Sequence, residues 1–336
     1  GGKIMTELGI LVKSYSGDFE YAQRLIASIN VHNVDLLPVY VVVPEVDLLQ
    51  FSQNNSDQIK ILSENLFAEH LVHQDTAGFS PGYINQEIIK LAFWELGVCD
   101  NYLCVDSDAQ FIRDFGRADF MALPGVPFTF LTEDRELHSE PGYFVDTWQS
   151  RIKSLEKIKR EIGYQGRWLL TVHGHAVFSA QVLQSFVTDF LQPRGWGYQD
   201  ALAISPYEPT WYNTWLLHTG VIEIVPREPI VKTFHNSTQH LDYLLREVKT
   251  EDIARGYVAV VVNSNYSRGD GVLSTNTSPT QLLASYISFG DLFTAFARRF
   301  TQRVLIEKRP LRSMRVQIGA QLLKLPMLRA LVNKVP

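Results

Sequence analysis

The 336-residue sequence has little cysteine and no long apolar run. Its two cysteines, Cys99 and Cys104, lie too close together for a disulfide framework, and no apolar stretch approaches the roughly 20 residues that span a bilayer. The beginning of the sequence also lacks the charged segment followed by a short apolar stretch that is typical of secretion signals. These absences argue against a secreted or membrane-spanning protein, and we expect a cytoplasmic one.

The sequence does contain enough apolar residues for a large core. Apolar residues make up 46% and aromatic residues 12% of the chain, which is sufficient for one large domain or two ordinary ones. The net charge of −5 is unevenly distributed. Residues 298–336 contain ten of the 31 Lys and Arg and one of the 36 Asp and Glu, so this tail is basic and the rest of the chain is acidic.

Continuous apolar strands alternate with helical patterns in the first third of the chain. Three runs, Leu8–Val12, Val39–Val43 and Ile59–Leu62, lack the alternation of a half-buried strand and indicate strands that are covered on both faces. Ser80 followed by Pro81 has the residue types that cap and open a helix. The pattern predicts an α/β fold with a mainly parallel central sheet flanked by helices.

A further apolar strand ends in two carboxylates. The run from Asn101 to Ile112 is apolar up to Val105 and then presents Asp106 and Asp108. Alternate residues of a strand point to the same face, and carboxylate oxygens are the ligands that hard divalent cations prefer. Two neighbouring carboxylates at the carboxyl end of a parallel strand therefore predict a metal site, because their charges need a cation or a basic partner. The alternative is an ordinary acidic turn after a strand.

Beyond residue 112 the regular alternation is lost. The patterns there predict a mixed half with strands at 128–131, 173–179, 220–225 and 257–262, and with helices at 142–162, at 181–190 and from 208 onward. Residues 232–236 are expected to lead out of the sheet. We expect one catalytic domain over residues 5–265, with halves at about 5–112 and 113–265, and a basic helical extension over residues 278–336.

Short runs within this organisation resemble a known enzyme family. The runs are Val12–Tyr15, Lys90–Trp94, Tyr102–Asp108 and Tyr207–Glu208. Together they are similar to a bacterial family of uncharacterised glycosyltransferase-like proteins. More broadly, an α/β half that ends in an apolar Asp-x-Asp strand and is followed by a mixed half resembles the Rossmann-like GT-A fold of nucleotide-sugar glycosyltransferases. The resemblance covers roughly residues 6–240.

The resemblance implies a metal-dependent hexosyltransferase of polysaccharide biosynthesis. Mn²⁺ or Mg²⁺ would be held by Asp106 and Asp108, and by His235 from a later loop, as in retaining enzymes that resemble glycogenin and the lipopolysaccharide galactosyltransferases. The donor would be a UDP- or GDP-sugar, and the acceptor a glycan or a lipid-linked glycan. Transfer with retention of configuration is the expected outcome.

The same resemblance implies a set of residues around the donor and the reacting atoms. The residues expected to contact the nucleotide sugar are Lys13, Ser14, Tyr15, Lys90 and Asp106. Lys13 is placed for the diphosphate charge and Tyr15 for stacking on the base, although both also suit a solvated loop. The expected catalytic residues are Glu208 and Asp108, and Glu208 alternatively stabilises the start of a helix. The pair His173 and His175 is more typical of structural histidines than of substrate ligands.

Two other classes of protein remain open at this point. A haloacid-dehalogenase-like phosphohydrolase also places Asp-x-Asp after an apolar strand, but that strand normally opens the fold, whereas about a hundred residues precede it here. A non-catalytic nucleotide-binding or sugar-binding protein would need the same residues without a reaction. Metal-dependent binding of nucleotide sugars distinguishes the transferase from both.

The basic tail carries an apolar stripe at helical spacing. The apolar positions are Leu311, Met314, Ile318, Leu322 and Leu325. A basic amphipathic helix of this kind is typical of soluble enzymes that lie on an anionic membrane, and the alternative is a helix packed on the acidic body. We expect peripheral association with the inner face of the cell membrane. A role in nucleic-acid binding is not expected, because the body is acidic and aromatic residues are scarce in the tail.

Overall fold

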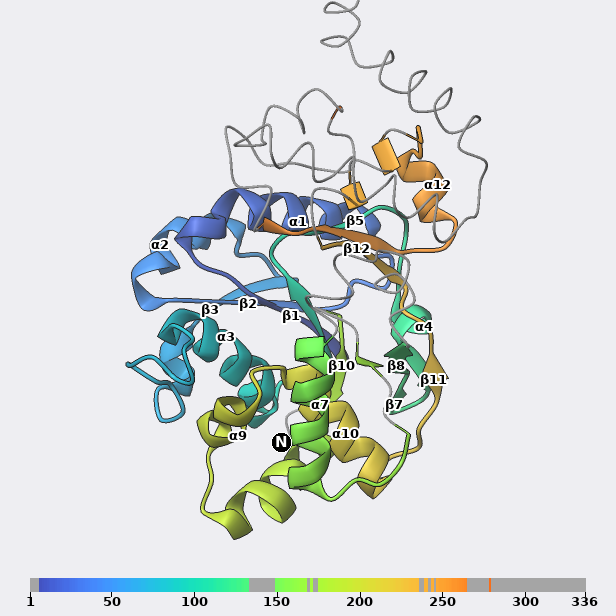
Figure 1. Ribbon diagram of the computed structural model, residues 1–336. Helices are drawn as coiled ribbons and strands as arrows, with labels where there is room; N and C mark the ends of the chain where they lie inside the picture. Colours follow the sequence, from blue (N-terminus) through green and yellow to red (C-terminus); the bar gives the residue numbers. More distant parts are fainter. Residues whose placement is uncertain are drawn as a thin grey trace, which may run out of the picture.

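The computed structural model describes residues 6–132, 149–167, 170–171, 175–235, 239–240, 243–244, 246–264 and 278. A five-stranded central sheet with the strand order β10-β4-β1-β2-β3 lies between helices (Figure 1). Its strands are β10 (Val177–Ser179), β4 (Cys99–Asp106), β1 (Thr6–Lys13), β2 (Val39–Val43) and β3 (Ile59–Ser63). Every pairing is parallel except that of the edge strand β10 with β4. The predicted α/β class with a mainly parallel central sheet is therefore confirmed.

Both faces of this sheet are buried, which explains the continuous apolar runs. Ile10 and Val12 of β1 belong to the core beneath α1 (Phe19–His32), whereas Leu11 belongs to the core beneath α3 (Pro81–Ala92). In Figure 1, α1 lies on one side of the sheet, and α3, α9 (Tyr198–Ile204) and α10 (Glu208–Thr219) lie on the other. Along β4 the residues Tyr102 and Cys104 face the α3 side, so the pleat directs the next alternate residue toward α3 as well.

The helix α3 begins and ends at the signals that the sequence carries. Ser80 Oγ accepts a hydrogen bond from the backbone N–H of Tyr83 (3.4 Å), and Pro81 occupies the first turn. The α-helical part ends at Ala92 and continues as a 3₁₀ turn, and Gly97 then adopts a left-handed conformation with φ of 59°.

Most of the remaining helices belong to the second half of the chain. They are α2 (Leu48–Phe51), α4 (Arg117–Phe120), α7 (Gln149–Ile162), α8 (Ala180–Ser185), α9 (Tyr198–Ile204), α10 (Glu208–Thr219) and α12 (Thr250–Ala254). The helix expected at 142–162 is present from Gln149, and residues 142–148 lie outside the described part. The helix expected at 181–190 is α8 continued by a π-helical turn at Phe186–Leu191.

Three smaller sheets complete the described structure. They are β12 (Val231–Phe234), β13 (Ala259–Val262) and β5 (Ala109–Phe111); β11 (Pro226–Arg227), β8 (Thr129–Thr132) and β9 (Leu170–Thr171); and β6 (Met121–Leu123) with β7 (Val126–Pro127). The strands expected at 128–131 and 257–262 are present as β8 and β13. Residues 232–236 do not simply leave the sheet region, because β12 pairs in parallel with β13.

The prediction of a strand at 220–225 is wrong. Gly220 ends α10 in a left-handed conformation, and residues 221–225 form no strand. The next strand, β11, begins at Pro226. Residues Val221, Ile222 and Ile224 are partly buried against the core below α3, so packing against that core explains the apolar pattern. Pairing with β8 begins only where the backbone N–H of Thr129 donates to the carbonyl oxygen of Val225 (2.9 Å).

The expected extension over residues 278–336 lies outside the described residues, apart from Ser278. The domain boundaries therefore stay a prediction. Among the described helices, none has the length and apolar character needed to cross a membrane.

Candidate functional site

The two strand-end carboxylates lie at the junction of two sheets. Asp106 is the last residue of β4, Ser107 and Asp108 form a turn, and β5 begins at Ala109. The expectation that both carboxylates belong to one strand is therefore wrong. The chain leaves the central sheet after Asp106 and enters the sheet formed by β12, β13 and β5 one turn later.

The turn between the carboxylates is fixed to the end of β1. Ser107 is buried, its Oγ donates to the carbonyl oxygen of Lys13 (3.1 Å), and it lies 3.1 Å from Oγ of Ser14. The strand register also places Asp106 beside Lys13. The structure thus brings together the run after β1 and the run after β4, which the sequence analysis had singled out separately.

Lys13 is buried, and its ammonium group pairs with a carboxylate that directly follows the strand β3. Its Nζ lies 3.2 Å from Oε2 of Glu64, directly after β3, and donates to the carbonyl oxygen of Ser14 (2.9 Å). Burial lowers the pKa of Lys13 from its ordinary value, although Glu64 counteracts the effect. Nearby, Tyr15 is 39% exposed, and the backbone N–H of Ser16 donates to Oδ2 of Asp47 (2.8 Å). This edge combines an exposed ring with a cation, but Lys13 is already paired.

Lys90 is the centre of a buried charge network below Asp106. Its side chain projects from α3, and its Nζ lies 3.2 Å from Oδ1 of Asp106, 3.1 Å from Oε1 of Glu208 and 3.4 Å from Oε2 of Glu87. Lys90, Glu87 and Glu208 are each at most 5% exposed. The carboxylates around it raise the pKa of Lys90 well above its ordinary value, against the opposing effect of burial.

Sequence reasoning expected Lys90 and Glu208 at the site but missed Glu87. Glu87 lies one turn before Lys90 on the same face of α3, and this spacing is the signal that was available. Glu208 is the first residue of α10, so the network connects the second half of the chain to the end of β4. The contact of Lys90 with a nucleotide sugar stays a prediction.

Asp108 is held by the opposite sheet. Its Oδ2 accepts a hydrogen bond from the backbone N–H of Ser264 (2.8 Å), and its carbonyl oxygen accepts from the backbone N–H of Val262 (3.3 Å). Burial and the neighbouring charge of Asp106 raise the pKa of Asp108 to about 7, although the Ser264 hydrogen bond favours the ionised form. The ionised form of Asp108 is therefore less favourable than that of an exposed carboxylate.

The histidines singled out in the sequence lie at different places in the structure. His235 directly follows β12, whose last residue is paired with Val262, so it lies at the same end of this sheet as Asp108. Its backbone N–H donates to Oε1 of Gln239 (2.8 Å). His175 is buried just before β10, and His173 lies outside the described residues. Binding of a metal by His235 stays a prediction.

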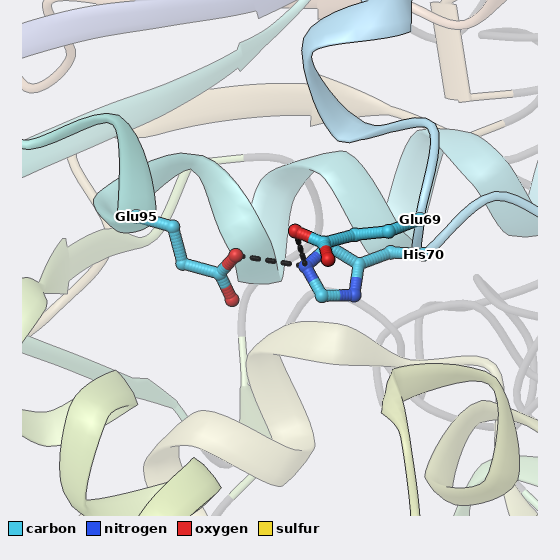
Figure 2. A group of neighbouring side chains, drawn as sticks. All are labelled: Glu69, His70 and Glu95. Atoms are coloured by element: carbon cyan, nitrogen blue, oxygen red, sulfur yellow. Dashed lines mark hydrogen bonds and ion pairs between the residues drawn. The ribbon is translucent and has the colours of Figure 1, made fainter.

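A second group of titratable side chains lies away from this edge. Among the described residues, Glu69, His70 and Glu95 are the group whose ligand atoms all lie within 4.8 Å of one another (Figure 2). Nε2 of His70 lies 2.7 Å from Glu95 and 3.7 Å from Glu69, and Oε1 of Glu95 accepts from the hydroxyl of Tyr198 (2.6 Å). Both carboxylates point at the same nitrogen (Figure 2), and Glu95, on the turn that follows α3, also contacts Tyr198 of α9, so these contacts account for the group.

The chain belongs to a family of unknown function, DUF6492, which it matches over residues 4–196. No match is found among curated proteins. Among solved structures, the chain is similar to the apo form of the bifunctional glycosyltransferase WbbM, with 10% identity, a TM-score of 0.45 and coverage of 89% of this chain and 53% of that one. It therefore spans about half the length of WbbM.

A second similar structure is the apo form of mouse xyloside xylosyltransferase 1. The identity is 12%, the TM-score is 0.44, and the similarity covers 78% of this chain and 99% of that one. Both structural neighbours are glycosyltransferases.

Proposed function

We propose that the protein is a metal-dependent glycosyltransferase that moves a sugar from a nucleotide diphosphate sugar to a glycan or lipid-linked acceptor. The observation that carries the proposal is the excess of carboxylates at the carboxyl end of the central sheet. In the described residues, Asp106, Glu87 and Glu208 converge on one ammonium group, that of Lys90, and Asp108 lies just beyond them. A divalent cation would balance this charge.

The two strand-end carboxylates fit such a cation in their chemistry and orientation. One oxygen of Asp106 is held by Lys90 and one oxygen of Asp108 is held by the N–H of Ser264. Hydrogen bonds of this kind orient metal-binding carboxylates while their other oxygen coordinates the ion. Because oxygen ligands suit Mn²⁺ and Mg²⁺, we assign Asp106 and Asp108 to the metal, with His235 as a further ligand.

The cation would supply charge neutralisation for the diphosphate that leaves during transfer. The residues of the chain would do the rest. Tyr15 would stack on the base at the exposed edge, and Lys13 and Ser14 would line the side of the diphosphate. Lys90 would hold Asp106, and Glu208 would face the donor sugar or the acceptor from the start of α10. We propose transfer with retention, and proton NMR of the product anomer tests it, because an inverted product excludes it.

A thermal-shift panel tests the proposed function directly. UDP, GDP and their hexose conjugates are added to the protein with and without Mn²⁺. The expected result is a rise in melting temperature for one nucleotide class that requires Mn²⁺, because a ligand that binds the folded state alone stabilises it. A panel without any Mn²⁺-dependent rise would exclude the proposal. Nucleotide binding that is indifferent to Mn²⁺ would favour a non-catalytic binding protein.

We also propose that the basic tail places the enzyme on the inner face of the cell membrane. Its residues lie outside the described part, and the support is the sequence: ten Lys and Arg in residues 298–336 and an apolar stripe at helical spacing. Each basic residue near an anionic surface contributes about 1 kcal/mol at low salt. The full-length protein should float with phosphatidylserine-containing liposomes at low salt, whereas a protein truncated after Phe300 should not. Equal flotation of both would assign the tail a structural role.

A further inference from the structure

Glu87 is a buried acid to which no role has been assigned. It lies on α3, is 4% exposed, and accepts a hydrogen bond from Nζ of Lys90 (3.4 Å). Glu208 contacts the same ammonium group (3.1 Å). Burial of a carboxyl group costs free energy unless the group is hydrogen-bonded. The burial of Glu87 beside Lys90, which also contacts Asp106, therefore requires an explanation.

The ammonium group of Lys90 has no donor to spare. An ammonium carries three N–H groups, and Nζ of Lys90 has three carboxylate partners, Glu87, Asp106 and Glu208. These partners come from α3, from the end of β4 and from the start of α10. Three acceptors from three elements fix the ammonium between them, and among these three only Asp106 is a proposed metal ligand.

The surroundings of Glu87 favour its protonated form. Burial, together with the charge of Glu208, raises the pKa of Glu87 well above its ordinary value. A neutral carboxyl group donates one hydrogen bond and still accepts another. In its protonated form Glu87 accepts from Lys90 without adding a third negative charge around the ammonium.

We propose that Glu87 is a positioning residue of the metal and nucleotide site, an inference that rests on the proposed function. Glu87 acts through Lys90: it engages one N–H of the ammonium and limits how closely Lys90 pairs with Asp106. The charge of Asp106 then stays available to a cation. Without Glu87 the ammonium pairs more closely with Asp106 and competes with the cation for it.

Two substitutions of nearly equal size separate this role from simple packing. Glu87→Gln keeps one donor and one acceptor, whereas Glu87→Met keeps the length and removes both. Calorimetric titration with UDP at saturating Mn²⁺ should give Glu87→Gln an affinity within about twofold of the wild type. Glu87→Met should bind about tenfold more weakly, as expected for loss of an outer partner of a metal ligand.

The melting temperature without metal provides the second readout. Glu87→Gln should melt close to the wild type, whereas Glu87→Met should still fold but melt at a lower temperature, because it removes one partner of the buried ammonium. Glu20→Met, on the exposed face of α1, is the matched control and should change neither quantity.

Each other outcome is decisive. If the wild type itself shows no Mn²⁺-dependent binding of UDP or GDP, the proposed function fails and this inference fails with it. If the wild type binds and Glu87→Met binds equally well, the inference alone is overturned. A Glu87→Gln protein as weak as Glu87→Met, or a Glu87→Met protein that does not fold, would also overturn it, since the first requires a charged Glu87 and the second a structural one.

Discussion

Replacing Asp106 with asparagine is expected to lower the affinity for UDP in the presence of Mn²⁺ by about 100-fold, the equivalent of about 3 kcal/mol. Asparagine keeps the shape of the side chain but removes the negative charge that would hold the cation. Lys90 keeps its two other carboxylates, Glu87 and Glu208, so the fold should survive. Calorimetry with and without Mn²⁺ measures the loss.

The matched control for this substitution is Asp100→Asn. Asp100 lies on the same strand, β4, but it is exposed near the opposite end. This variant should bind as the wild type does. If Asp106→Asn binds UDP with Mn²⁺ as tightly as Asp100→Asn, then Asp106 is not a metal ligand and the excess of carboxylates has another cause.

Replacing Lys90 with methionine should have the largest effect on stability. The substitution leaves Glu87, Asp106 and Glu208 close together without the cation that neutralises them, and Glu87 and Glu208 are buried. Removing one partner of a buried ion pair typically costs about 3–5 kcal/mol. Urea denaturation should show this loss as a lower midpoint with an unchanged slope.

Lys60→Met is the control for the loss of a lysine. Lys60 is exposed on β3, and its Nζ donates to the carbonyl oxygen of Ser56 (3.0 Å), so its replacement should change stability little. Adding Glu208→Gln to Lys90→Met should restore part of the lost stability, because the two residues are in contact and their effects are not additive. Equal midpoints for the Lys90 and Lys60 variants would show that the network does not stabilise the fold.

The central strands were predictable because burial alone explains their apolar residues. Strands β1 and β2 are largely apolar on both faces, and each of the three apolar runs in the sequence corresponds to one strand, β1, β2 or β3. The start of α3 was predictable because Ser80 and Pro81 act locally, through the first turn of the helix. In these places a single physical requirement fixes both the residues and the structure.

The remainder depended on contacts between distant parts of the chain. The apolar pattern at 220–225 reflects burial against the core, which periodicity cannot distinguish from pairing in a sheet. The break in the strand after Asp106 depends on β13, about 150 residues later, which pairs with β5. The convergence of Glu87 and Glu208 on Lys90 joins two helices that are far apart in sequence. The spacing of Glu87 and Lys90 shows that they share a face of α3, but no sequence spacing shows that Glu208 joins them.

Because of the turn at Ser107, the distance between Asp106 and Asp108 depends on how a distant part of the chain packs. Asp106 ends a strand of the central sheet, whereas the oxygens of Asp108 are held by Val262, the last residue of β13, and by Ser264, two residues later. The separation of the two carboxylates is therefore a measure of how the two sheets are aligned. A substitution that shifts β13 relative to β5 should therefore move Asp108 relative to Asp106 while both residues stay the same.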